Sequence, residues 1–227
     1  IYELNRLSQK KIQILHDLGI YAIDEIPADF KLSDFQELQR EVVKDEQGIR
    51  DQESIDKALG ELEYPLYFFD YETLPFAVPR VEGFKPHQHL PVQYSLHTVH
   101  ENGEVVHTEY LASELAPPIK LIEQMKQEIG STGTLISWYK SFEQSRNREM
   151  AEMYPEHADF LDDINIRTFD LMGIFKKDFV HRDFEGSQSI KKVQPVLVPD
   201  LSYKTLDVQN GTMAVDAAER RFKMTDE

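Results

Sequence analysis

The sequence predicts an α/β fold in which a mixed β-sheet is flanked by helices, with a helical segment in front of it. Up to about residue 62, apolar residues recur at helical spacing, and Ser33 with Gln36 forms a capping box that begins one helix. From Tyr64 onward, short apolar runs and alternating stretches typical of strands appear, and helical patterns follow them. We therefore expect a helical connector over residues 1–62 and an α/β domain over residues 63–227.

Composition narrows the functional classes. Net charge is −16 over 227 residues, which argues against a protein that coats nucleic acid with a basic face, although a local basic groove would be enough for a nuclease. The absence of cysteine excludes disulfides, thiolate metal sites and thiol nucleophiles, and it fits a cytoplasmic protein. No apolar run of about 18 residues predicts a membrane span. Because the chain begins at Ile1 and ends abruptly, we expect it to be cut from a longer protein.

The helical segment contains one pattern with a possible function. Residues 15–20, followed by Ile23 and Ile26, are similar to a helix-hairpin-helix unit, with a second short helix after Gly19. Such a unit can grip a phosphate backbone at its tight turn. Since little basic charge surrounds Gly19, we favour the alternative that this segment packs as a collar on the next domain.

The order of the predicted elements after Tyr64 indicates a topology. A short buried strand runs into Asp70, a loop spans residues 73–91, and Asn102-Gly103 marks a hairpin. The predicted strands cover residues 65–69, 92–100, 104–111 and 134–138. The predicted helices cover about residues 117–129, 142–154, 158–163, 169–179, 189–195 and 212–222. This is the order of the ribonuclease H-like fold, in which the first three strands are antiparallel and the fourth pairs parallel to the first.

Asp70 and Glu72 are the first candidate catalytic residues. Side chains alternate along a strand, so these two carboxylates point to the same side. Two adjacent carboxylates repel each other, and a divalent cation between them would relieve the repulsion. Asp-x-Glu alone is common and favours the alternative of two solvated acids at a strand end, but the aromatic strand that leads into the pair favours a site.

Glu143 is the third candidate. A predicted strand ends near Trp138, and an acid follows in the first turn of a helix, from where it could reach the same metal ion. The alternative is an ordinary acid that the helix dipole stabilises.

Together these features resemble the DEDD exonuclease superfamily, whose first motif is Asp-x-Glu and whose second motif carries an Asn and an aromatic-Asp pair. The matching positions of the second motif here are Lys140, Phe142 and Glu143, so Lys replaces Asn and Glu replaces Asp. The resemblance implies that Asp70, Glu72 and Glu143 bind two Mg²⁺ or Mn²⁺ ions and hydrolyse phosphodiester bonds from a 3′ end.

A closer resemblance is to a bacterial family, domain of unknown function 2779. It is carried by residues 67–73, residues 91–97, Arg167 with Asp170 and Leu171, and residues 186–195. It implies a DEDD-like nuclease domain that is often linked to an upstream RecB-like or Cas4-like nuclease region.

A third DEDD motif, Tyr or His a few residues before an Asp, is expected on the last helix. Asp216 is the only candidate there, and Thr212 and Gly211 stand where the Tyr or His would be. We favour the interpretation that the motif lies beyond Glu227, with Asp216 as a weak substitute.

Several polar residues are candidates for substrate binding. Ser189 could cap a helix whose free amides bind phosphate, and Lys191 adds positive charge; a capped helix with solvated lysines is the equal alternative. The full set is Thr73, Lys140, Ser187, Ser189 and Lys191. His87 and His89 could flank the site, whereas Arg167 and Asp170 are interpreted as a local ion pair.

The sequence therefore predicts a metal-dependent 3′-5′ exonuclease acting on a single-stranded end of DNA or RNA. One rival is a catalytically weak or inactive module that binds nucleic acid or docks another protein within a larger nuclease. Another rival is a phosphoesterase that acts on small nucleotides.

Overall fold

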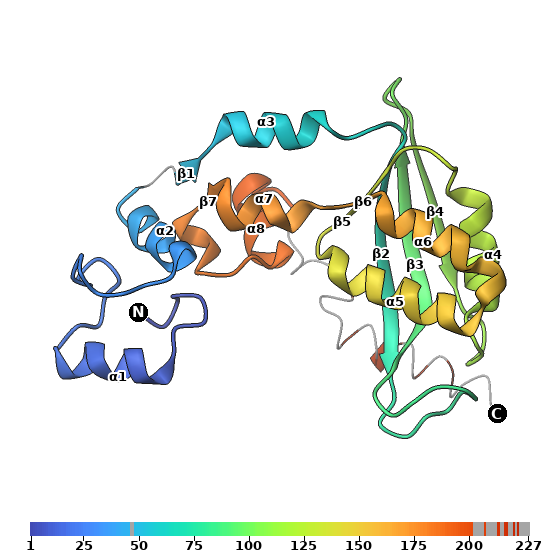
Figure 1. Ribbon diagram of the computed structural model, residues 1–227, viewed down its shortest axis with the longest axis horizontal. Helices are drawn as coiled ribbons and strands as arrows, with labels where there is room; N and C mark the ends of the chain where they lie inside the picture. Colours follow the sequence, from blue (N-terminus) through green and yellow to red (C-terminus); the bar gives the residue numbers. More distant parts are fainter. Residues whose placement is uncertain are drawn as a thin grey trace. The chain divides into compact units, whose positions relative to one another are not determined.

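The computed structural model describes residues 1–45 and 48–201, together with residues 207, 213, 216, 217, 220 and 222. The chain divides into two compact units, shown in Figure 1. The helical unit consists of Ile1–Glu61 with Met172–Tyr203, and the sheet unit consists of Leu62–Leu171 with Lys204–Glu227. Within the described residues, none of the helices combines the length and apolar character needed to cross a membrane.

A five-stranded mixed sheet forms the centre of the sheet unit. Its strands are β2 (Leu66–Pro75), β3 (His89–Val99), β4 (Val105–Leu111), β5 (Thr134–Ser137) and β6 (Thr168–Asp170). They lie in the order β4-β3-β2-β5-β6. β3 is antiparallel to both β2 and β4, while β5 is parallel to β2 and β6. This arrangement confirms the predicted α/β fold with the strand order of the ribonuclease H-like fold.

Three helices cover one face of this sheet, as Figure 1 shows. They are α4 (Ile119–Glu128), α5 (Lys140–Met153) and α6 (Ala158–Ile166). On β2 the side chains of Tyr67, Phe69 and Tyr71 are buried in the core that these helices help to form. Because side chains alternate, Asp70 and Glu72 both point to the opposite face, so the prediction that these two side chains share one side is confirmed.

The strands extend beyond their predicted ends. β2 continues through Asp70 to Pro75, and β3 begins at His89, so the predicted loop over residues 73–91 is too long. Both strands gain this length by pairing with each other, with an irregularity between Glu72 and Thr73. The loop prediction was therefore wrong at both ends because cross-strand pairing outweighed the local proline signals.

The prediction of a helix over residues 169–179 was also wrong. Residues 168–170 form β6, which pairs with β5, and α7 (Ile174–Lys177) is a single short turn of helix. A three-residue strand is too short to show an alternating pattern, so its partner strand decides the conformation. This correction places Asp170 at the end of a parallel strand.

The helical unit contains α1 (Gln9–Asp17), α2 (Asp34–Val42), α3 (Gln52–Gly60), α7 and α8 (Ile190–Leu197). A small antiparallel ladder joins β1 (Ile49–Arg50) to β7 (Phe179–Val180). This ladder, with the packing of α2 against α7, brings the segment that begins at Met172 and includes α7 and α8 into the same compact unit as the N-terminal segment. Short 3₁₀ helices lie at Pro155–His157, Leu171–Gly173 and Arg182–Phe184.

Two local predictions in this unit have opposite outcomes. The capping box is confirmed, since the backbone N–H of Gln36 donates to Ser33 Oγ (3.3 Å) and the backbone N–H of Ser33 donates to Gln36 Oε1 (3.0 Å). The prediction of a second helix in the helix-hairpin-helix unit is wrong, because residues 20–33 form turns and bends. There the Glu25 carboxylate accepts hydrogen bonds from the amides of Tyr21 and Ala22, which closes a turn instead of a helix.

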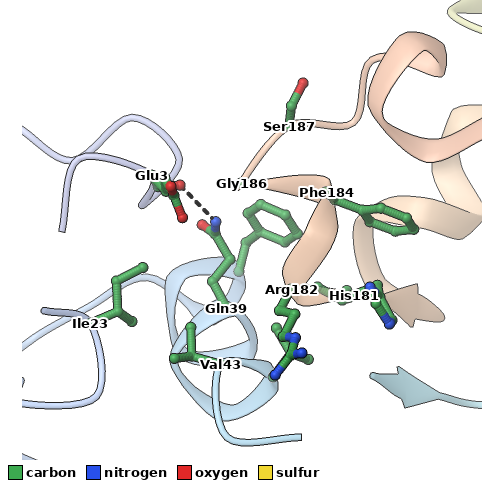
Figure 2. Close-up of a pocket in the computed structure, with 12 residues that line it drawn as sticks. Glu3, Ile23, Gln39, Val43, His181, Arg182, Phe184, Gly186 and Ser187 are labelled. Atoms are coloured by element: carbon green, nitrogen blue, oxygen red, sulfur yellow. Dashed lines mark hydrogen bonds between the residues drawn. The ribbon is translucent and has the colours of Figure 1, made fainter. Parts of the chain in front are cut away.

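Gly186 marks a close approach within the helical unit. A Cβ atom at this position would overlap the carbonyl oxygen of Glu3 and lie 2.5 Å from Gln39 Nε2. Figure 2 shows Gly186 beside the hydrogen bond from Gln39 to Glu3, which is 3.0 Å long. The cavity here is about 20 Å³, which is room for roughly one water molecule. We therefore interpret it as a packing joint rather than a substrate pocket.

We expect Gly133→Ala to destabilise the sheet unit more than Gly103→Ala. Both glycines have a positive φ (91° and 85°), which costs an alanine about 1–2 kcal/mol. At Gly133 the new Cβ would also lie 2.9 Å from the backbone nitrogen of Pro65, whereas nothing lies within 4 Å at Gly103. Urea denaturation should show an additional loss of roughly 1–3 kcal/mol for Gly133→Ala. Equal losses would contradict this packing argument.

Candidate functional site

Three carboxylates gather where the parallel strands end. Asp70 lies on β2 two residues beyond Phe68, the last residue that pairs with β5. Glu143 lies in the first turn of α5, which follows β5, and Asp170 is the last residue of β6. The carboxyl ends of neighbouring parallel strands meet at one edge of a sheet, which is where α/β folds bind ligands. We call Asp70, Glu143 and Asp170 the carboxylate cluster.

The electrostatics of the carboxylate cluster centre on Glu143, which is 5% exposed. The pKa of Glu143 is raised to about 7, mainly by burial and in addition by the negative charges of Asp70 and Asp170. A hydrogen bond from its own backbone amide and the positive charge of Arg146 act in the opposite direction. Asp70 as a whole residue is exposed on the sheet face. The protein atoms around its carboxylate nevertheless remove part of its hydration, and this desolvation raises the pKa of Asp70.

Hydrogen bonding leaves part of the carboxylate cluster unsatisfied. Within the described part of the chain, Glu143 Oε2, Asp170 Oδ1 and the neighbouring Ser137 Oγ are buried and have no hydrogen-bond partner. Buried polar atoms are nearly always paired, so such a group of oxygens is unusual. Oxygen donors with excess negative charge are the chemistry that Mg²⁺ and Mn²⁺ prefer.

The cluster is not a ready-made metal site in this arrangement. Among the described residues, no three His, Asp or Glu side chains lie close enough together to hold a metal ion. A cation would therefore have to draw the carboxylates of the cluster closer to one another. The donor chemistry fits a divalent cation, and the spacing requires side chains to move.

A buried hydrogen-bond chain positions α5 against β2. The Tyr71 hydroxyl donates to Asn147 Oδ1 (2.8 Å), and Asn147 Nδ2 donates to Asn165 Oδ1 (2.9 Å) on α6. Burial, together with the charge of Glu143, raises the pKa of Tyr71 well above its usual value, so this residue stays a neutral donor. Tyr71 lies between Asp70 and Glu72, and Asn147 lies one turn after Glu143. The chain therefore ties the two acid-bearing elements together.

A second group of side chains lies beside the carboxylate cluster. Arg146, 8% exposed, places its guanidinium 4.9 Å from the centre of the Phe142 ring. His89 meets the same ring edge-on at 5.4 Å, and its Nδ1 is 2.7 Å from Thr73 Oγ1. His89 therefore packs against α5, and Thr73 is its direct hydrogen-bond partner.

The remaining candidates from the sequence are distributed more widely. Glu72 lies on the same face of β2 as Asp70 and is partly exposed, and Lys140 is the partly exposed first residue of α5. Asp216 is an exposed residue in helical conformation. Thus the structure brings Asp70 and Glu143 into one electrostatic group and adds Asp170 to it. The sequence interpretation had assigned Asp170 to an ion pair with Arg167.

The predicted phosphate-binding segment belongs to the helical unit. Ser189 is the N-cap residue of α8, but its side chain makes no capping hydrogen bond. Instead its amide donates to Ser187 Oγ at 3.1 Å. In Figure 2 the Ser187 side chain points away from Glu3 and Gln39. Lys191 is exposed, and its neighbour Lys192 forms an ion pair with Glu185.

The interpretation of Arg167 and Asp170 as an ion pair is wrong. Arg167 binds Asp163 instead, with Nε and Nη2 at 2.9 and 2.7 Å from Oδ2. It also donates to the carbonyl oxygens of Gly130, Thr132 and Gly133, so it fastens the loop before β5. Asp170 is thereby left to act on Glu143. The available signal was an aspartate ending a strand, but the three-residue β6 was not recognisable.

We expect Tyr71→Phe to lower the free energy of unfolding by roughly 1–3 kcal/mol, because Asn147 Oδ1 would lose its donor in a buried site. Tyr64→Phe is the matched control, since Tyr64 is 49% exposed and removing its hydroxyl should change stability little. Chemical denaturation measures both. A Tyr71→Phe protein as stable as the control would show that the chain does not hold α5.

The raised pKa of Glu143 predicts a pH dependence of stability. A folded pKa of about 7, above the usual glutamate pKa of 4.5, means that the folded state binds the proton more tightly than the unfolded state. Stability should therefore fall as pH rises from about 4.5 through 7. Glu143→Gln mimics the protonated form, so it should match the parent protein at pH 5 and exceed it at pH 8 by up to roughly 3 kcal/mol.

Urea denaturation at pH 5, 6, 7 and 8 tests this, with the exposed Glu152→Gln on the same helix as control. The control should keep the pH dependence of the parent protein. If Glu143→Gln keeps the pH dependence of the parent protein as well, ionisation of Glu143 is not the cause of that pH dependence.

Comparisons with known proteins follow the same part of the chain. The family model Domain of unknown function (DUF2779) matches residues 67–189, from β2 to the N-cap of α8. The Uncharacterized protein MG366 homolog of Mycoplasma pneumoniae is 26% identical over 175 residues, which is 68% of this chain and 26% of that protein. The Uncharacterized protein MG366 of Mycoplasma genitalium is 25% identical over 177 residues, again 68% of this chain and 26% of that protein.

This chain therefore spans about a quarter of the length of these relatives. No solved structure matches it. The family match includes Asp70, Glu143 and Asp170, and it covers more than half of the chain. The chain belongs to the DUF2779 family.

Proposed function

We propose that this protein is a metal-dependent nuclease domain that hydrolyses phosphodiester bonds of DNA or RNA, working from a 3′ end. The observation that carries the proposal is the carboxylate cluster, in which the pKa of Glu143 is raised by burial and by the charges of Asp70 and Asp170. Its unsatisfied oxygens lie at the end of the parallel strands in a sheet with the ribonuclease H-like order.

Asp70, Glu143 and Asp170 are the residues that would hold Mg²⁺ or Mn²⁺, with Glu72 as a further oxygen donor two residues from Asp70. When bound, such an ion lowers the pKa of a water molecule and stabilises charge on the leaving oxygen. The protein itself supplies the geometry. Tyr71 holds α5 against β2, and burial of Glu143 keeps its carboxylate poorly hydrated, which favours its pairing with a cation over water.

The substrate, partners and location belong to the same proposal. A single-stranded end would bring a phosphodiester to the cluster, with Thr73 and Lys140 of the same unit as candidate contacts. Because the curated relatives are far longer than this chain, an upstream RecB-like or Cas4-like region in the full-length protein fits the proposal. The absence of cysteine fits action in the cytoplasm.

Cleavage of 3′-labelled single-stranded DNA and RNA by this chain in Mn²⁺ tests the function. We expect stepwise shortening that Asp70→Asn and Glu143→Gln each reduce by at least about a hundredfold, because each removes a donor to the cation. Asp162→Asn, an exposed acid on α6, should keep full activity. Cleavage that survives Asp70→Asn would refute the assignment of the site.

One observation favours a second candidate, a nucleic-acid-binding or docking module without catalysis. Within the described residues, no three-ligand group is preformed. This module would bind single-stranded nucleic acid and leave it intact in the same assay. Cation binding separates the two, because only the nuclease should show a Mn²⁺-dependent rise in melting temperature that Asp70→Asn abolishes.

A further inference from the structure

Arg146 is an unusual residue in this acidic protein. It lies on α5 three residues after Glu143 and is 8% exposed, while the protein carries a net charge of −16. Charged side chains are rarely this buried unless they are fully paired. Its guanidinium lies over the Phe142 ring, and this contact fixes its orientation.

The hydrogen-bonding capacity of Arg146 is mostly unused. A guanidinium has five N–H donors. Among the described residues Arg146 makes one hydrogen bond, from Nη2 to Glu149 Oε1 at 2.6 Å, and its Nε is buried without a partner. A monodentate contact with one carboxylate leaves the planar fork free for a second, bidentate anion.

The surroundings place this fork next to the carboxylate cluster. The charge of Arg146 lowers the pKa of Glu143 and, after burial, the pKa of His89, so the guanidinium acts on both residues. No hydrogen bond joins Arg146 to Glu143 in the structure, so Glu143 does not occupy the fork. His89 is paired with Thr73, and both the imidazole and the guanidinium pack against the Phe142 ring.

We propose that Arg146, with His89 and Thr73 beside it, binds the phosphate group of the substrate next to the carboxylate cluster. The planar fork of arginine matches the oxygens of a phosphate, whereas a point charge such as lysine does not. This proposal rests on the proposed function for the identity of the substrate, and it explains how an acidic site attracts an anion. The buried guanidinium supplies locally the positive charge that the protein lacks overall.

Calorimetric titration with inorganic phosphate and with dimethyl phosphate, both in EDTA, tests the anion site without any metal or cleavage. We expect saturable binding that Arg146→Gln weakens at least tenfold and that Arg148→Gln leaves unchanged. Arg148 is the matched control, because it lies on the same helix and is exposed. Preference for dimethyl phosphate would indicate an internal phosphodiester, and preference for inorganic phosphate a terminal one.

Two further variants keep the test decisive if Arg146→Gln does not fold. Arg146→Lys keeps the charge and loses the fork, so phosphate binding should weaken about tenfold. Glu149→Gln removes the carboxylate that holds Nη2, so phosphate binding should become tighter. Wild-type protein that binds neither anion, or Arg146 variants that bind them unchanged, would overturn the proposal.

The titration is also independent of the proposed nuclease. Phosphate binding that depends on Arg146 in a protein that cleaves nothing would sustain the anion site and reject the catalytic function. Cleavage that depends on Asp70 in a protein whose phosphate binding ignores Arg146 would do the reverse.

Discussion

The alternation of side chains along β2 is the constraint on which the rest of the site depends. One face of this strand buries Tyr67, Phe69 and Tyr71 under the helices, and this packing fixes which way Asp70 and Glu72 must point. A slip of one residue would bury the acids and expose the aromatic rings. Because β2 pairs with β3 on one side and β5 on the other, such a slip would break both ladders.

β5 is short, and its end lies at the edge of the sheet where the candidate site is formed. β5 ends at Ser137, so the chain turns into α5 beside Asp70 rather than continuing the sheet. The buried contact from Tyr71 to Asn147 then holds α5 in place. As a result, the negative charges of Asp70 and Asp170 lie near Glu143 and raise its pKa. The positive charge of Arg146, on the next turn of the helix, partly offsets this rise.

Local patterns predicted most of the elements correctly, including the hairpin of β3 and β4, the helices α4 and α5 and the capping box at Ser33. They failed where pairing with a distant segment decided the conformation. β6 has only three residues and exists because β5 lies beside it, and the turns after Gly19 replace a helix because Glu25 satisfies the local amides. Within the site, Asp70 and Glu143 followed from motifs, but Asp170 and Arg146 did not.

The sequence by itself determined the strand that carries Asp70 and Glu72, the common face of these two acids, the position of Glu143 in a first helical turn and the membership of the family. These features depend on periodicity and motif spacing, which are properties of the chain. Only the tertiary structure decided that Asp170 belongs with Glu143 and that Arg146, whose charge also acts on Glu143, has a buried Nε without a hydrogen-bond partner. The spacing of residues along the chain does not give the distance between side chains on different strands and helices. Only the packing of these elements sets which charged side chains interact.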